Sequence, residues 1–127
     1  MTTRRILISL LAAGPLLFGT GALATEYTAA AFESAQKTGK PILVHITAPW
    51  CTTCAAQKPI LSKLRADPKF KDLQVFEIDF DSRKDVVKQF GATMQSTLIT
   101  FKGAKETGRS AGETNPEAIS SLLNKAI

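Results

Sequence analysis

The chain has 127 residues and a formal net charge of +5, and 44% of its residues are hydrophobic. This length allows one domain with one hydrophobic core. The basic residues are scattered among acidic ones and form no cluster with aromatic residues, so nucleic-acid binding has little support. The chain also shows no internal repeat, linker or low-complexity segment.

The first 24 residues have the pattern of an export signal. Arg4 and Arg5 precede an uncharged run from Ile6 to Phe18, and small residues then lead to Ala22-Leu23-Ala24. This order is typical of a signal peptide that is cleaved after Ala24, which predicts a periplasmic or secreted protein. A retained membrane anchor is the alternative, although the run barely reaches the ~20 residues of a spanning helix. Cleavage removes two arginines and no acid, so residues 25–127 would form one domain with a net charge of +3.

This domain is predicted to begin with a short strand, a helix and a buried strand. The first strand extends at most from Glu26 to Thr28, and the helix from Thr28 to Thr38, with Gly39 as its stop. Residues Pro41 to Thr47 are apolar and β-branched, the composition of a buried strand. This strand leads into the only two cysteines of the chain.

The two cysteines form a Cys-x-x-Cys pair at the start of a predicted helix. From Cys51 to about Ala66 apolar residues recur at helical spacing, with Pro59 as an internal bend. The first turn of a helix stabilises an anion, so a Cys51 thiolate is favoured there. Cys54 lies one turn further along, close enough to form a disulfide and better shielded from solvent. We predict that Cys51 attacks a substrate sulfur and that Cys54 resolves the mixed disulfide.

The rest of the chain is predicted to contain a strand, a helix, a hairpin and a final helix. The strand extends from Leu73 to Phe80, and Ser82 caps the helix that ends at Phe90. Residues Thr97 to Lys102 and roughly Lys105 to Ser110 pair as a hairpin. Asn115-Pro116-Glu117 starts the final helix with a cap and a proline in the first turn.

Together these motifs resemble the thioredoxin superfamily. The resemblance rests on the segment from Ala48 to Cys54, on Pro59, on Phe90-Gly91 and on Thr97 to Lys102, and it covers roughly Ala29 to Ile127. It implies an α/β thioredoxin fold, with a central mixed β-sheet flanked by helices on both faces. It also implies a monomeric thiol–disulfide oxidoreductase that acts on protein disulfides or dithiols through Cys51 and Cys54 and needs no cofactor.

A narrower similarity concerns the segment from Gly39 to Val44. It resembles exported thioredoxin-like domains, including the C-terminal domain of the electron-transferring protein DsbD. That similarity implies a reductant that receives electrons from a membrane partner. The Thr52-Thr53 pair between the cysteines matches neither the reducing nor the strongly oxidising members of the superfamily.

The resemblance also assigns roles to two residues near the cysteines. Trp50 would flank the active site and offer an apolar surface to the substrate, and a plain core tryptophan is the alternative. His45 lies six residues before Cys51, where thioredoxins place a buried acid behind the second cysteine. Burial lowers the pKa of a histidine, so a neutral His45 could accept the proton of Cys54. A hydrogen-bonded core histidine without a kinetic role is the alternative.

Ser96 stands in the place of the family's cis-proline, in the loop that faces the cysteines. A cis bond before a non-proline residue costs ~2.5–4 kcal/mol, so we expect a trans Gln95-Ser96 bond. Both residues are expected to shape the substrate groove. In the family the proline keeps metal away from the thiols, so its loss suggests a second hypothesis. This is a metal carrier that binds copper, zinc or an iron–sulfur cluster through Cys51, Cys54 and either Ser96 or an outside ligand.

Overall fold

The computed structural model describes residues 24–127, so the predicted signal peptide lies outside the described residues except for Ala24. In chain order the elements are β1 (Thr25–Glu26), α1 (Ala29–Lys37), β2 (Pro41–Thr47), α2 (Thr52–Arg65), the short 3₁₀ helix η1 (Pro68–Phe70), β3 (Gln74–Asp79), α3 (Lys84–Gln89), β4 (Thr97–Lys102), β5 (Lys105–Ala111) and α4 (Pro116–Asn124). Within residues 24–127 no helix is both long and apolar enough to cross a lipid bilayer.

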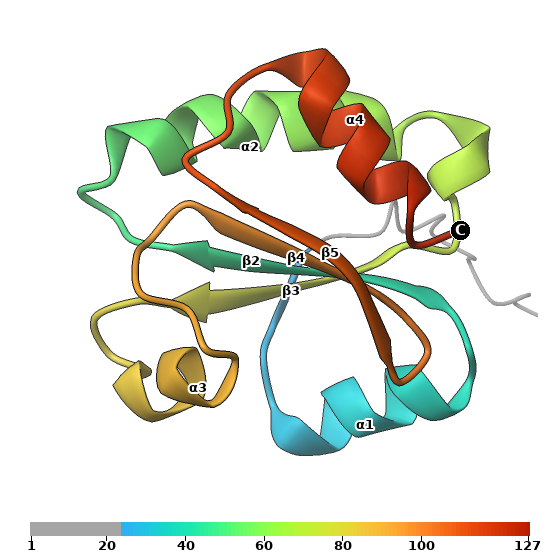
Figure 1. The fold of residues 1–127 in the computed structure, drawn as a ribbon, viewed down its shortest axis with the longest axis horizontal. Helices are drawn as coiled ribbons and strands as arrows, with labels where there is room; N and C mark the ends of the chain where they lie inside the picture. The colour runs from blue at the N-terminus through green and yellow to red at the C-terminus, as the bar shows by residue number, and fades with distance from the viewer. Residues whose placement is uncertain (1–23) are drawn as a thin grey trace, which may run out of the picture.

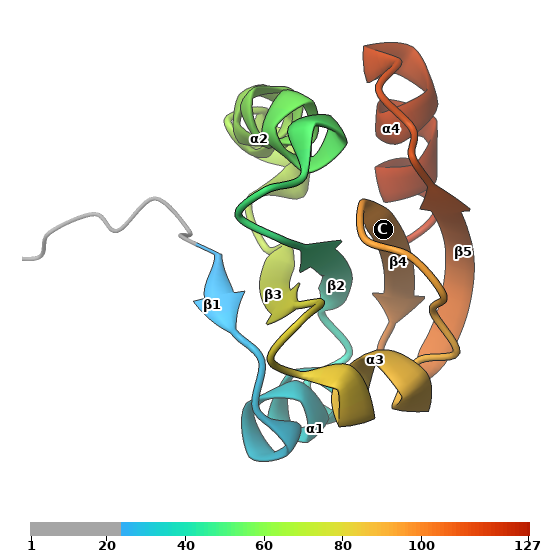
Figure 2. The same cartoon turned by 90° about the vertical axis from the view of Figure 1, so that its left-hand side faces the viewer.

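The strands form one mixed sheet in the order β1-β3-β2-β4-β5. Strands β1 and β2 run parallel to β3, whereas β4 runs antiparallel to β2 and to β5. Helix α2 provides the crossover that the parallel pair β2 and β3 needs. Helices α2 and α4 cover one face of the sheet, and α1 and α3 cover the other (Figures 1 and 2). The predicted mixed sheet with helices on both faces is therefore confirmed.

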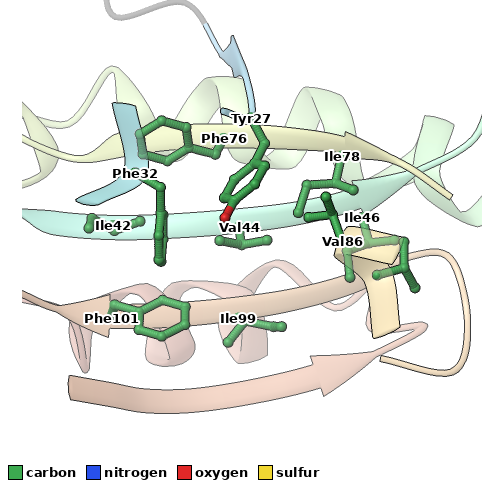
Figure 3. Close-up of a cluster of buried hydrophobic side chains, with 11 residues drawn as sticks. Tyr27, Phe32, Ile42, Val44, Ile46, Phe76, Ile78, Val86, Ile99 and Phe101 are labelled. Carbon is green, nitrogen blue, oxygen red and sulfur yellow. The ribbon is translucent and has the colours of Figure 1, made fainter. Parts of the chain in front are cut away.

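The central strand β2 sends alternate side chains to the two helical layers. Three of its residues join the hydrophobic cluster on the side of α1 and α3, which Figure 3 shows: Ile42, Val44 and Ile46. Leu43 instead joins the cluster beneath α2 and α4. His45 and Thr47 alternate with the first set, so they share the face of Leu43. The strand thereby places a histidine beneath the helix that carries the cysteines.

An aromatic cluster fixes α1 against the other face of the sheet. The Phe32 ring lies 5.3 to 5.7 Å, between centroids, from four other rings, those of Tyr27, Phe76, Phe90 and Phe101. Three of these contacts are edge-to-face, an arrangement that aromatic pairs favour. This aromatic layer therefore packs α1 onto the side of the sheet opposite the cysteines.

Two predicted boundaries are wrong, and each has a structural cause. Strand β1 begins at Thr25, one residue before the predicted start, because Thr25 pairs with Phe76 of β3. It ends at Glu26, within the predicted limit, since the Thr28 side chain caps α1 by accepting a hydrogen bond from the Ala31 N–H at 3.2 Å. Ser82 does not cap α3, which begins at Lys84 without a side-chain cap. Asp79 explains the difference, because its carboxylate accepts the Ser82 N–H at 2.8 Å and forms a turn before the helix.

Candidate active site

Cys51 is the N-cap residue of α2, as the sequence pattern predicts. Its Sγ accepts a hydrogen bond from the Cys54 N–H at 3.0 Å. The two cysteines form a disulfide, with their Cα atoms 5.2 Å apart. Cys51 is 5% exposed and Cys54 is 1% exposed, so the second cysteine is the better shielded of the two. The pair is therefore arranged for attack through Cys51.

The start of α2 favours negative charge on the Cys51 sulfur. No acidic residue lies in the first turn of this helix. The backbone N–H of Cys54 is directed at Cys51 Sγ, and the positive end of the helix dipole adds to its effect. After reduction of the disulfide, the same groups would stabilise a Cys51 thiolate, the reactive form of the thiol.

Trp50 lies on the surface beside the cysteines. Its side chain is 58% exposed, so the alternative of a plain core tryptophan is wrong. The indole Nε1–H donates a hydrogen bond to Asp81, which follows the end of β3. Asp81 was not predicted from the sequence, although the parallel pairing of β2 with β3 brings the residues after both strands to one edge of the sheet.

His45 is buried beneath α2, with only 1% of its surface exposed. Burial lowers its pKa below the ordinary 6.5, while a hydrogen bond from its Nε2 to Gln57 Oε1 at 3.0 Å and the charge of Glu77 partly oppose this. The positive charge of Lys58 lowers the pKa further. The histidine is therefore neutral at pH 7, as predicted. It also lines a cavity of about 170 Å³, together with Lys58, Arg65 and Glu77.

Gln57 connects His45 to the loop that faces the cysteines. Its side chain is fully buried, and its Nε2 donates hydrogen bonds to the Ser96 carbonyl at 3.1 Å and to the Glu113 carbonyl at 2.9 Å. This residue was not predicted from the sequence. The available signal is a polar side chain three residues after Cys54, on the helix face that otherwise points to the core.

Ser96 is the one non-glycine residue of the described chain with a positive φ, at 61°. Its N–H donates to the Ile46 carbonyl at 2.8 Å, and its carbonyl accepts the Gly112 N–H at 3.1 Å as well as the Gln57 amide. Residues 24–127 contain no cis peptide bond, so the expected trans Gln95-Ser96 bond is confirmed. The side chain of Ser96 is 1% exposed. Ser96 can therefore shape a groove only through the backbone of its loop, whereas Gln95 is partly exposed.

The structure gives the metal-carrier hypothesis no support. Within residues 24–127, no three His, Cys, Asp or Glu side chains gather in a way that could hold a metal ion. His45 is engaged by Gln57 beneath α2, and the Ser96 hydroxyl donates to the Gln95 carbonyl. The two cysteines therefore lack neighbouring protein ligands.

A disulfide-forming cysteine pair at the start of a helix, directly after the central strand of a mixed sheet, defines a thiol–disulfide oxidoreductase. The family model described as Thioredoxin matches residues 24–125. The chain therefore belongs to the thioredoxin family, and its fold is the thioredoxin fold. Thioredoxin-like proteins act on protein disulfides.

Comparison with individual proteins agrees with this family. The crystal structure of Trxlp from Edwardsiella tarda EIB202 is similar, with a TM-score of 0.77 and 42% sequence identity over 80% of this chain and 98% of that chain. Thioredoxin-2 of Saccharomyces cerevisiae is 31% identical over 97 residues, 76% of this chain and 90% of the yeast protein. Thioredoxin Asp f 29 of Aspergillus fumigatus is 29% identical over 95 residues, 75% of this chain and 86% of the fungal protein.

Proposed function

We propose that this protein is an exported oxidoreductase that reduces disulfide bonds in other proteins. The observation that carries the proposal is the position of Cys51 as the N-cap of α2, with the Cys54 N–H on its sulfur. That position favours the Cys51 thiolate, and Cys54 is the better shielded of the two cysteines. The two thiols would therefore act in sequence on one substrate disulfide.

The reaction would proceed in two exchange steps. The Cys51 thiolate attacks one sulfur of the substrate disulfide, forms a mixed disulfide and releases the other substrate sulfur as a thiolate. Cys54 then loses its proton and attacks Cys51 Sγ, which breaks the mixed disulfide and releases the second substrate thiolate. The substrate gains two electrons, and the protein is left with the Cys51–Cys54 disulfide.

His45 is proposed to accept the proton of Cys54 in the second step. Gln57, its hydrogen-bond partner, lies three residues after Cys54 on the inner face of α2, which is about 4.5 Å along the helix axis. A neutral imidazole, buried beneath the helix that carries this thiol, is suited to act as a general base. Trp50, Gln95 and the backbone of Ser96 would border the groove in which the substrate lies.

Trapping of the mixed disulfide tests these roles. A Cys54→Ser variant should accumulate a mixed disulfide between Cys51 and a substrate, whereas the matched Cys51→Ser variant should trap none. Resolution of a mixed disulfide preformed on Cys51 should be about 10²-fold slower in His45→Ala, with the initial attack nearly unchanged. An unchanged resolution rate in a folded His45→Ala variant would remove His45 from the mechanism.

The direction of electron flow can be tested through the reduction potential of the Cys51–Cys54 pair. Thiol alkylation across a glutathione and dithiothreitol series measures this potential in the purified, metal-free protein. A value near ~−270 mV, typical of thioredoxin, would support a reductant, and one near ~−120 mV would support an oxidant. Failure to form the disulfide at any potential would refute the proposed function.

Export is proposed from the sequence of the first 24 residues, and the membrane electron donor from the DsbD-like segment at Gly39 to Val44. Expression of the whole chain in a bacterial host tests the first point. A protein in the periplasmic fraction that begins at Thr25 would support the signal peptide, whereas an uncleaved chain in the membrane fraction would favour the anchor. The released protein should elute from a sizing column as a monomer.

A further inference from the structure

The hydrogen bonds around Gln57 fix the orientation of its side-chain amide. One end of the amide faces two backbone carbonyl oxygens, those of Ser96 and Glu113, at 3.1 and 2.9 Å. Carbonyl oxygens only accept hydrogen bonds, so this end must be the NH₂ group, which has two N–H donors. The opposite end, which faces His45, is therefore the carbonyl oxygen Oε1.

This orientation decides which ring nitrogen of His45 carries a proton. Nε2 lies 3.0 Å from Gln57 Oε1, which can only accept a hydrogen bond. An unprotonated Nε2 would also be an acceptor, so the two atoms could not form a hydrogen bond. Nε2 must therefore be the protonated nitrogen. In the neutral imidazole, the other nitrogen, Nδ1, is then the one with a free lone pair.

We propose that Gln57 is a positioning residue, which holds His45 in the Nε2–H tautomer so that Nδ1 is the atom that accepts a proton. The catalytic part of this inference rests on the proposed role of His45, whereas the tautomer itself does not. His45, Gln57 and Ser96 are each no more than 1% exposed, so water does not replace these hydrogen bonds. Gln57 thereby fixes the ring relative both to α2 and to the loop that faces the cysteines.

The burial of Gln57 at this position supports a positional role. An amide inside a helix–sheet interface is unfavourable unless all its hydrogen bonds are made. Here both N–H groups and the oxygen have partners, on β2, on the loop before β4 and on the loop before α4. A leucine at this position would fill the same space but would not orient the His45 ring. The amide of Gln57 therefore serves to orient the ring, and packing alone does not explain it.

Nitrogen NMR of the histidine ring tests the tautomer directly. His45 is the only histidine in the chain, so a protein labelled with ¹⁵N-histidine gives the signals of one ring. At pH 7.5 we expect a protonated Nε2, with a slowly exchanging proton, and an unprotonated Nδ1. A ring protonated on Nδ1 in the wild-type protein would overturn the proposal, whatever the kinetic role of His45.

Two substitutions separate orientation from packing. Gln57→Leu removes the acceptor of the Nε2–H group, so rapid exchange of this proton and about 10-fold slower resolution of a Cys51 mixed disulfide are expected. Gln57→Glu retains an acceptor for Nε2–H but loses the amide donors to the Ser96 and Glu113 carbonyls. It should therefore restore the protected proton but only part of the rate. Gln89→Leu, at an exposed position of α3, is the matched control and should change neither.

A double substitution distinguishes failure of this inference from failure of the proposed function. If Gln57 acts through His45, then Gln57→Leu should cause no further slowing in a His45→Ala background. Equal slowing in both backgrounds would overturn the positioning role. If His45→Ala alone leaves resolution unchanged while the NMR spectrum shows a protected Nε2–H, then the proposed function of His45 fails and the tautomer assignment stands.

The pH dependence of the resolution rate provides a further test. If Gln57 had only a structural role, its substitution would not change the pH at which this rate has its inflection. The resolution rate should rise with pH as His45 loses its proton, with an inflection below pH 6.5. Loss of the Gln57 acceptor should move this inflection to lower pH. The charged groups that line the same cavity are Lys58 and Arg65 from α2 and Glu77 from β3, and all three stay in place in these variants. An inflection that does not move in Gln57→Leu would contradict the proposal.

Discussion

Substitution of Ser96 by proline tests how the loop facing the cysteines is held. Ser96 has a φ of 61°, whereas the proline ring fixes φ at about −65°. Proline also lacks the N–H that Ser96 donates to the Ile46 carbonyl at 2.8 Å. The loop would have to rearrange, although proline stands at this place in the superfamily that the sequence resembles. We therefore expect Ser96→Pro to destabilise the protein.

The magnitude follows from the bonds that are lost. A buried carbonyl of Ile46 without its partner costs ~1–3 kcal/mol. Rearrangement of the loop would also weaken the bonds from Gln57 and Gly112 to the Ser96 carbonyl, at ~0.5–1.5 kcal/mol each. The gain from relief of the positive φ, of order 1–3 kcal/mol, offsets part of this. A net loss of about 1–3 kcal/mol is expected, from a total of ~5–15 kcal/mol for a domain of this kind.

Urea unfolding of the oxidised protein, followed by Trp50 fluorescence, measures this loss as a lower midpoint. Ser96→Gly is the matched control, because glycine keeps the N–H and tolerates the positive φ. Its free energy of unfolding should lie within ~1 kcal/mol of the wild-type value. A proline variant that unfolds at the wild-type midpoint or above it would refute the reasoning, since the bond to Ile46 would then contribute nothing.

Two further predictions concern stability. Burial holds the pKa of His45 below 6.5 in the folded protein. In the unfolded chain the same histidine takes up a proton near pH 6.5, whereas the folded protein takes it up only at lower pH. The contribution of His45 to the free energy of unfolding should therefore be fully present above pH 6.5. As the pH decreases below 6.5, the free energy of unfolding should decrease by at most about 1.4 kcal/mol per pH unit. Between pH 6.5 and 5, a His45→Gln variant should lose this slope, and a wild-type curve without a slope would contradict the reasoning. Gly108→Ala should cost ~1–3 kcal/mol, because the new Cβ would lie 2.8 Å from Leu122 Cδ1. Thermal unfolding measures this cost, and a melting temperature equal to that of the wild type would show that the Leu122 side chain moves aside at little cost.

The sequence predicted most of the fold, because its signals are local. The apolar run of β2, the spacing in α2 and the Asn115 cap of α4 each depend on neighbouring residues, and all three are confirmed. The failed cap at Ser82 has a different cause. Its pattern is that of a helix start, but Asp79 at the end of β3 accepts the Asp81 and Ser82 N–H groups and holds these residues in a turn before the helix. The capping pattern alone cannot show that this turn forms instead.

The parts of the site that sequence reasoning missed depend on distant residues. Asp81 meets Trp50 across 31 positions, and Gln57 meets the carbonyls of Ser96 and Glu113 across 39 and 56 positions. Such pairs follow from strand order and from the end of the sheet at which each loop lies. In the sequence, Gln57 is one polar residue in a helix that has many. Only its position on the core-facing side of that helix, where the structure shows it fully buried, distinguishes it.

The structure connects two departures from the family pattern that are separate in the sequence. By the resemblance to thioredoxins, His45 stands where the family has a buried acid and Ser96 where it has a proline, and Gln57 bonds to both residues. The bond to the Ser96 carbonyl depends on the loop conformation, which in turn depends on the positive φ of Ser96. Residues in one hydrogen-bond network have non-additive effects on stability.

The Gln57→Leu and Ser96→Pro substitutions should therefore be coupled. Either change alone weakens the bond between the Gln57 amide and the Ser96 carbonyl, so the double variant cannot lose that bond twice. We expect its loss of stability to be smaller than the sum of the single losses by ~0.5–3 kcal/mol, measured by urea unfolding of all four proteins. Gln89→Leu combined with Ser96→Pro gives the uncoupled reference. Strictly additive losses for Gln57 and Ser96 would mean that the loop and the histidine are held independently, and that the two departures are unrelated in this protein.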